Sequence, residues 1–236
     1  MTPTLAVFGA GPALGLSVAR RFGAEGYQVA LVGRNRTTLD SLENALAAAG
    51  TKSFGVAADL TELAQVRAAA AAIADRFGTP DVVLYSPGDV SRLPVGVLEL
   101  DPEELTTWLP LNLLSPVALV RAVLPAMLER GSGALLFAQG ISARQPMPAL
   151  ASTATAQAAL LSYLTSLALE VAPRGVHVAS LLIGALIERS AAARLWDDGR
   201  FADIQVGEIP RVDPDDLAQR YWELLRDRDQ HEVLAV

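Results

Sequence analysis

Apolar segments rich in β-branched residues alternate with alanine-rich helical segments along the whole chain. The expected strands are 5–8, 28–32, 54–57, 82–85, 134–138, 176–183 and 233–236. The expected helices are 16–25, 37–49, 62–77, 113–129, 154–171 and 213–226. Near-continuous apolar strands separated by helices predict a buried parallel sheet with helices on both faces. The sequence therefore predicts one α/β domain over residues 1–236, with three layers.

A glycine-rich turn lies between the first strand and the first helix. It reads Gly9-Ala10-Gly11-Pro12-Ala13-Leu14-Gly15. Small residues let the backbone approach a pyrophosphate, and the start of the helix offers N–H donors and the positive end of the helix dipole. A tight turn without a ligand would need fewer glycines. We therefore expect a doubly wound Rossmann-type fold in which Gly9, Gly11, Ala13, Leu14 and Gly15 bind a dinucleotide.

The composition narrows the chemistry. The chain has no Cys, and its two histidines, His177 and His231, lie far apart in the sequence, so neither a thiolate nucleophile nor a metal site is expected. A net charge of -7 and the lack of Lys or Arg runs disfavour nucleic acid as a partner. The sequence suggests no apolar stretch long enough for a bilayer and no leader with a cleavage site. A soluble cytoplasmic protein that binds a small molecule is expected.

With these features the chain resembles the short-chain dehydrogenase/reductase (SDR) family. The family's Thr-Gly-x-x-x-Gly-x-Gly motif aligns with Phe8, Gly9, Ala13 and Gly15, and Ala13 adds a methyl group where the family has glycine. The downstream segments 157–160 and 166–176 also follow the family pattern. The resemblance implies an oxidoreductase that transfers hydride to a small carbonyl or imine-like substrate.

The end of the second strand bears on the choice of cofactor. NAD-binding SDR proteins usually carry an acid at the position of Gly33, and this chain has none. Arg34 is placed to pair with a 2′-phosphate, because its guanidinium group matches phosphate oxygens, and Arg36 is a possible assistant. NADP is therefore the expected cofactor. The other cofactor contacts that the resemblance implies are Asp59, Leu60, Ser86, Pro87, Gly88, Gln157 and Gly184.

The catalytic positions depart from the family pattern. The family has a Ser after the fifth strand, then a Tyr, and a Lys four residues after the Tyr on the same helix face. These positions align with Gly140, Thr153 and Gln157, whereas Asn112 matches the family's Asn. A Thr hydroxyl has a far higher pKa than a Tyr hydroxyl, and Gln has no charge to lower it. General acid–base catalysis is worth roughly 10²- to 10⁴-fold in rate, and Thr153 would forfeit most of it.

Other residues near these positions are candidates to replace the missing groups. Gln139 and Ser142 flank Gly140 and could orient a substrate, and Arg144 could bind a carboxylate. Glu188 follows the sixth strand, and a carboxyl buried there would have a raised pKa and could donate a proton. A cationic substrate such as an iminium would accept hydride without a strong acid.

Three functions remain open from the sequence. The first is an NADP-dependent oxidoreductase with a rebuilt proton donor, and the second is a catalytically inactive protein that binds NADP as a sensor or assembly partner. The third is a non-redox enzyme on the same scaffold, because fold alone does not set function. A long irregular segment at 184–210, with Trp196, Phe201 and Ile204, reads as a lid over an apolar ligand, which favours the first.

The helix at 154–171 is apolar on more than one face. Leu160, Leu161, Leu164, Leu167 and Leu169 cannot all face one sheet. A helix that is apolar all round is buried on each side. A homodimer or homotetramer is therefore expected, in line with the assemblies usual in SDR proteins.

Overall fold

The core of the protein is a seven-stranded sheet in the order β3-β2-β1-β4-β5-β6-β9. The computed structural model describes residues 2–202, 204 and 207–235. The strands are β1 Thr4–Phe8, β2 Gln28–Gly33, β3 Ser53–Ala57, β4 Val82–Tyr85, β5 Gly133–Gly140, β6 Val176–Ile183 and β9 Glu232–Ala235. Every neighbouring pair is parallel. This arrangement confirms the predicted doubly wound Rossmann-type fold. The order of the strands reverses between β1 and β4, which is where such sheets bind ligands.

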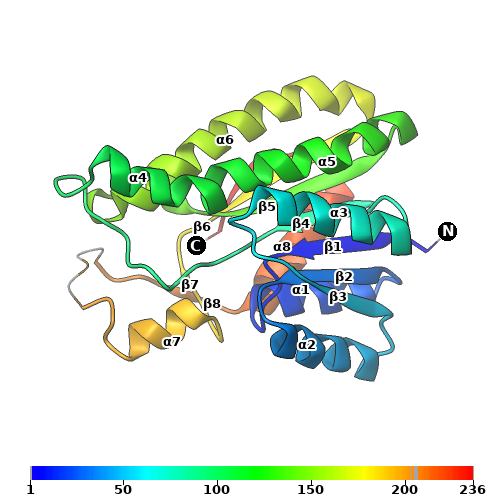
Figure 1. Ribbon diagram of the computed structural model, residues 1–236, viewed down its shortest axis with the longest axis horizontal. Coiled ribbons are helices and arrows are strands. Elements are labelled where there is room, and N and C mark those ends of the chain that lie inside the picture. The colour runs from blue at the N-terminus through cyan, green and yellow to red at the C-terminus, as the bar shows by residue number, and fades with distance from the viewer. Residues whose placement is uncertain (1, 203, 205–206, 236) are drawn as a thin grey trace.

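Helices cover both faces of the sheet (Figure 1). The main helices are α1 Leu14–Gly23, α2 Arg36–Ala48, α3 Leu63–Phe77, α4 Pro102–Leu109, α5 Ser115–Arg130, α6 Ala151–Val171 and α8 Pro214–Asp227. One core cluster joins α3, α5 and α6 to one face, and a second joins α1, α2 and α8 to the other. Because a cluster covers each face of the sheet, the strands carry apolar side chains on both faces, as is typical of buried parallel strands.

Two elements near α5 differ from the sequence predictions. The helix α4 was not predicted, although Asp101 caps it by accepting a hydrogen bond from the Glu104 N–H at 2.7 Å and Pro102 occupies its first turn. A π-helical turn at Pro110–Leu114 then joins α4 to α5. The resulting run, Pro102–Arg130, is by length and composition apolar enough to cross a membrane, which corrects the expectation that no such stretch exists. Its α5 part packs on the sheet through Leu119, Val120, Val123 and Met127.

The segment expected to be a long irregular connection contains regular structure. It includes β7 Leu186–Ile187 and the helix α7 Ala191–Asp197, and β7 pairs with β8 Arg211–Val212. Ser190 begins α7 by accepting a hydrogen bond from the Ala193 N–H at 3.0 Å. Trp196 and Phe201 stack on each other with ring centroids 5.9 Å apart, whereas residues 203, 205 and 206 lie outside the described residues.

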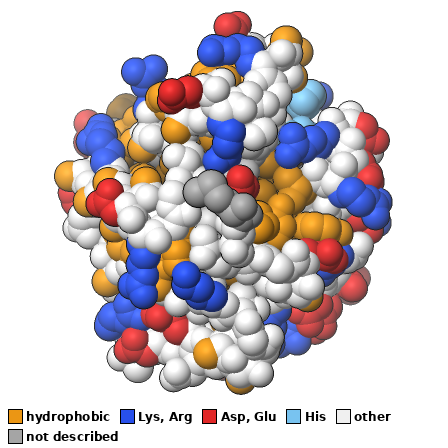
Figure 2. All heavy atoms as spheres, turned by 90° about the vertical axis from the view of Figure 1, so that its right-hand side faces the viewer, with side chains coloured by type: hydrophobic (Ala, Val, Ile, Leu, Met, Phe, Trp, Pro, Cys, Tyr) orange, Lys and Arg blue, Asp and Glu red, His pale blue; other side chains and the backbone are white. Residues whose placement is uncertain are grey.

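Charged side chains of both signs are mixed on the face where the chain begins. Figure 2 shows this face, which is the right-hand side of Figure 1, with Lys and Arg side chains beside Asp and Glu side chains and small apolar areas between them. Acidic and basic side chains lie close together here, as in the ion pair of Arg130 with Asp81 at 3.5 Å. This face therefore does not present a surface of one charge sign.

Candidate functional site

A groove crosses the sheet at the carboxyl ends of β1 and β4. It consists of two adjoining cavities of about 360 and 310 Å³, which we call the inner and the outer cavity. Both are lined by the glycine-rich turn, by Pro87 and Gly88 after β4, and by Ala191 at the start of α7. The inner cavity continues toward β5 and α6, and the outer cavity continues toward β2 and β3. This is the ligand position expected at the switch point of an open α/β sheet.

The backbone of the turn requires glycine at its first position. Gly9 has a φ of +92°, and a Cβ there would lie 2.4 Å from Pro87 Cα. A Cβ on Gly15 would meet Ala10 Cα at 3.0 Å, whereas the space beside Gly11 is open. The close packing of the turn against the end of β4 therefore leaves a smooth surface of backbone, with Gly11 facing free space where a ligand can approach.

The first turn of α1 has N–H donors to offer. Ala13 precedes the helix and provides no side-chain cap, and the first turn contains no acidic residue. Leu14 and Gly15, the first residues of α1, line the inner cavity together with Ala13. Uncapped N–H groups and the positive end of the helix dipole make this wall of the groove suited to an anion.

The outer cavity combines a base with fixed polar groups. Arg34, Asn35 and Thr38 line one side, and Asp59, Leu60 and Thr61 line another. The Asp59 carboxylate accepts hydrogen bonds from the Thr61 N–H at 2.9 Å and the Thr61 hydroxyl at 2.8 Å, which holds it in place. Gly33 adds no side chain, and a Cβ there would lie 3.2 Å from the Ala10 carbonyl oxygen.

Arg34 and Arg36 point to different partners. Arg34 is more than half exposed and lies 3.6 Å from Asp89, which also lines the outer cavity. Burial alone would raise the pKa of Asp89, but hydrogen bonds from Ser91 and the charges of Arg34 and Arg92 hold it below its usual value. Arg36 instead binds Asp40, Glu43 and the Gly55 carbonyl. None of these partners lines the groove, so the contacts give no support to the predicted assistance of Arg36.

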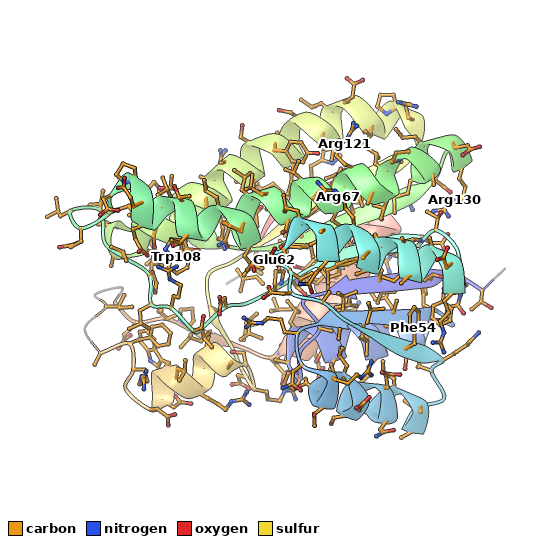
Figure 3. All side chains as sticks on the ribbon, viewed as in Figure 1. Phe54, Glu62, Arg67, Trp108, Arg121 and Arg130 are labelled. Carbon is orange, nitrogen blue, oxygen red and sulfur yellow. The ribbon has the colours of Figure 1, made fainter. Side chains whose placement is uncertain are left out.

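Side-chain amides occupy the floor of the inner cavity. Gln157 accepts a hydrogen bond from the Gly140 N–H at 2.9 Å and donates one to Asn112 Oδ1 at 3.2 Å. The Asn112 amide in turn donates to the carbonyl of Trp108 at 3.0 Å, and Trp108 is labelled on α4 in Figure 3. Gln139 donates to the Gln157 carbonyl at 2.8 Å. Hydrogen bonds between uncharged amide and backbone groups therefore connect β5, α6 and the π-helical turn.

The space above Gly140 is taken by its neighbours. A Cβ on Gly140 would lie 3.2 Å from Gln157 Oε1 and 3.4 Å from Ser142 Oγ. The distance to the amide oxygen is tighter than an ordinary van der Waals contact. The Gln157 side chain thus fits Gly140 because that residue has no side chain.

Two of the expected catalytic residues lie away from the groove walls. Thr153 is half-buried in the first turn of α6, and Glu188 is half-exposed after β7. The Glu188 N–H donates to the Val212 carbonyl at 2.9 Å, directly after the two paired residues of β7.

Arg144 does not line the groove and pairs with Glu232 at 3.4 Å, whereas the other expected residues lie in the groove walls or directly beside them. Asn112 does not line the groove itself and reaches it through its partner Gln157. Gly184 lies between the lining residues Ile183 and Ala185, and its N–H donates to the Ala235 carbonyl at 2.8 Å. Ser86, Gly140 and Gln157 line the inner cavity.

The groove also contains residues that the sequence did not single out. These are Val90, Ser190, Ala191, Ala192 and Arg194 in the inner cavity, and Asn35, Thr38 and Thr61 in the outer cavity. Ser190 before an alanine-rich stretch is a helix-start signal that predicts α7. Its position against the glycine-rich turn depends on tertiary packing, which no local signal contains.

The fold, the glycine-rich turn and the groove define a Rossmann-type protein that binds an anionic ligand at its switch point. The family model described as short chain dehydrogenase matches residues 3–194. The chain therefore belongs to the short-chain dehydrogenase/reductase family of oxidoreductases, as the sequence resemblance predicted.

Individual relatives share this architecture. A short chain dehydrogenase of Pseudocercospora fijiensis is 31% identical over 176 residues, which cover 73% of this chain and 56% of that protein's length. A single-residue variant of the actinorhodin polyketide ketoreductase with NADPH is 25% identical, with a TM-score of 0.86 over 100% of this chain and 95% of that chain. An NADPH-bound short chain oxidoreductase of Pseudomonas aeruginosa PAO1, described as containing an atypical catalytic center, is 25% identical, with a TM-score of 0.83 over 99% and 95% of the two chains.

Proposed function

We propose that this protein is an NADP-dependent oxidoreductase whose active site lacks the Ser, Tyr and Lys of its family. The observation that carries the proposal is the continuous groove, which has Arg34 at one end and the amides of Gln139 and Gln157 at the other. The cofactor, when bound, would supply the hydride. Two NADPH-bound neighbours in the same fold support this assignment.

In this proposal NADP lies along the groove, with its adenosine half in the outer cavity and its nicotinamide half in the inner cavity. In this proposal Arg34 pairs with the 2′-phosphate, because no acid stands at Gly33 to bind the ribose hydroxyls of NAD instead. Asp59, Leu60 and Gly88 would surround the adenosine, and Pro87 would bound it toward the turn. The glycine-rich turn and the start of α1 would hold the diphosphate. Ser86 and Gln157 would lie beside the nicotinamide riboside.

The inner cavity offers no group that readily gives up a proton. Of the described residues that line it, Arg194 is the only one with an ionisable side chain. Gln157 and Asn112 stand where the family resemblance expects a Lys–Asn pair, and both are neutral. We therefore propose that the Gln157 amide, held by Asn112, orients a substrate that accepts hydride without a strong acid, such as an imine or iminium compound. Thr153 and Glu188 have no part in this proposal.

The absence of an acid also favours a second function. A protein that binds NADP without turnover, as a sensor or assembly partner, would need the outer cavity and the glycine-rich turn but no proton donor. The apolar wall made by Val90, Ile183, Leu186 and Ile187 favours the oxidoreductase, because it provides room for a substrate body beside the cofactor.

Two measurements test the proposal in sequence. Calorimetric titration of the purified protein with NADPH and NADH comes first, and we expect clear preference for NADPH. NADPH consumption is then followed with matched panels of ketones and imines. Turnover of imines but not ketones supports the acid-free site. Binding without turnover of either panel supports the sensor, and no binding of either nucleotide overturns both.

Three wider features are part of the same proposal. We propose that α7 and its flanks act as a lid, that the protein works in the cytoplasm, and that it forms a homodimer or homotetramer.

The proposed assembly concerns the surface of α6 and its neighbour α5. Leu169 on α6 is 72% exposed, and α5 carries Arg121 beside α6 (Figure 3). Leu160, Leu161 and Leu164 of the same helix are buried within the chain, so the support for a partner helix on α6 is Leu169 alone. A monomer mass by light scattering would contradict the proposed assembly.

A further inference from the structure

Arg194 on α7 differs in its partners from the arginines on either side of the lid. Arg189 binds Asp213 at 2.6 Å and Asp215 at 3.1 Å, and Arg211 binds Asp197. Among the described residues Arg194 forms no ion pair, yet it lines the inner cavity. Its one side-chain hydrogen bond in the described structure goes to the Arg189 carbonyl at 3.3 Å. An arginine has five N–H donors, so the described residues satisfy only a small part of its hydrogen-bonding capacity.

The helix that carries Arg194 begins beside both cavities. Ser190 caps it, and Ala193 is buried at 3% exposure. Ala191, one turn before Arg194 on the same side of the helix, lines both cavities beside the glycine-rich turn. Arg194 itself is exposed and lines the inner cavity, one turn along the helix from this shared residue.

The start of α1 lines the same cavity and is also electropositive. Ala13, Leu14 and Gly15 present this start, which has no side-chain cap, to the inner cavity. None of the described residues that line the inner cavity is acidic, so Arg194 and the start of α1 would both stabilise negative charge on a bound ligand. A cationic or neutral substrate would not supply that charge, whereas a dinucleotide has a doubly charged diphosphate between its two halves.

We propose that Arg194 binds the diphosphate of the cofactor and so closes α7 over the groove. This inference rests on the proposed NADP-dependent function. The planar guanidinium group can donate two parallel hydrogen bonds to phosphate oxygens. The contact couples cofactor binding to the position of the lid. Arg194 is thus a cofactor-positioning residue and takes no part in proton transfer.

The test compares Arg194→Gln with Arg200→Gln by calorimetry. Arg200 is an exposed arginine of the same segment that does not line the groove, so its variant is a matched control. Three probes divide the cofactor: NADPH, 2′-phospho-ADP-ribose, which keeps the diphosphate without nicotinamide, and adenosine 2′-monophosphate, which has no phosphate at the 5′ position. We expect Arg194→Gln to weaken NADPH and 2′-phospho-ADP-ribose by about 10- to 100-fold. Adenosine 2′-monophosphate should bind equally to all variants.

The possible binding results distinguish failure of the proposed function from failure of the Arg194 inference. If the wild-type protein binds no NADPH, the proposed function itself fails. If wild type binds NADPH and Arg194→Gln binds the two diphosphate probes equally well, the inference fails while the function stands. Equal weakening of all three probes would indicate a general loss of structure and would also overturn it. Arg194→Lys keeps the charge without the planar fork, and we expect a loss between those of wild type and Arg194→Gln.

Discussion

The position of the Gln157 side chain depends on the absence of a side chain at Gly140. The Gln157 amide bonds to the Gly140 N–H, and a Cβ at Gly140 would press on that amide at 3.2 Å. We expect Gly140→Ser to displace the amide and lower the free energy of unfolding by about 1 kcal/mol, the net value of a hydrogen bond. The backbone itself accepts serine, because Gly140 has a φ of -70°.

A double-mutant cycle isolates this contact. Gly140→Ser should cost less in a Gln157→Ala background, since no amide then occupies the space, and urea unfolding measures all four proteins. Strictly additive changes in the free energy of unfolding would contradict the coupling. The same contact explains why restoring the family's Ser alone is not expected to restore a family-type site.

The two arginines after β2 provide a matched pair for the cofactor prediction. Arg34→Ala should weaken NADPH by about 10- to 100-fold and leave NADH nearly unchanged, because only NADPH has the 2′-phosphate. Arg36→Ala should leave the ratio of the two affinities unchanged, since Arg36 binds Asp40, Glu43 and Gly55 instead. Calorimetric titration of both variants is the measurement. An equal loss of both cofactors in Arg34→Ala would remove the assigned role.

At the scale of elements, the start of α4 depends on one side chain. Asp101→Ala removes the oxygen that accepts the Glu104 N–H at 2.7 Å, and we expect a loss of about 1 kcal/mol in the free energy of unfolding. Asp101→Asn keeps a capping oxygen and should lose much less. Urea unfolding distinguishes the two variants, and similar losses in both would show that charge rather than capping stabilises the helix.

Local signals account for much of the fold but for little of the site. The strands β4 and β6 have the bounds that their apolar runs predict, and Asp213, the first residue of the expected helix 213–226, caps α8. The helix α4 has comparable signals in Asp101 and Pro102, so its start could also be predicted from the sequence. The contact of Gln157 with Gly140 joins residues 17 positions apart through a side-chain amide, and periodicity does not specify it.

The same limit applies to Glu188. The sequence places an acid just after β6, where the ends of strands meet ligands. In the structure β7 pairs with β8, a segment more than twenty residues later, and Glu188, directly after β7, is not among the residues that line the groove. Long-range pairing of this kind overrides sequence position, and it also brings the unpredicted α7 over the cofactor groove.

At the scale of the whole molecule, we expect the free energy of unfolding to depend on pH through a pair of histidines at the β6–β9 edge of the sheet. His177 on β6 is buried, and its ring lies 5.7 Å from that of His231 at the start of β9. Burial first, and then the charges of His231 and Arg228 against a smaller opposite effect of Asp229, lower the pKa of His177 to about 4. The Nε2 atom of His177 has no hydrogen-bond partner among the described residues.

The lowered pKa means that the unfolded chain binds a proton more readily than the folded one. Above the ordinary His pKa of about 6.5 neither state is protonated, so the stability is fully present there. It should fall as the pH drops from about 6.5 through the folded-state pKa near 4. His177→Val suits a buried strand and removes this titration. Urea unfolding at about pH 7 and about pH 4.5, on either side of the ordinary His pKa, should therefore show a smaller loss in His177→Val than in wild type. An equal loss in both proteins would place the acid sensitivity in the carboxylates instead of in the β6–β9 edge.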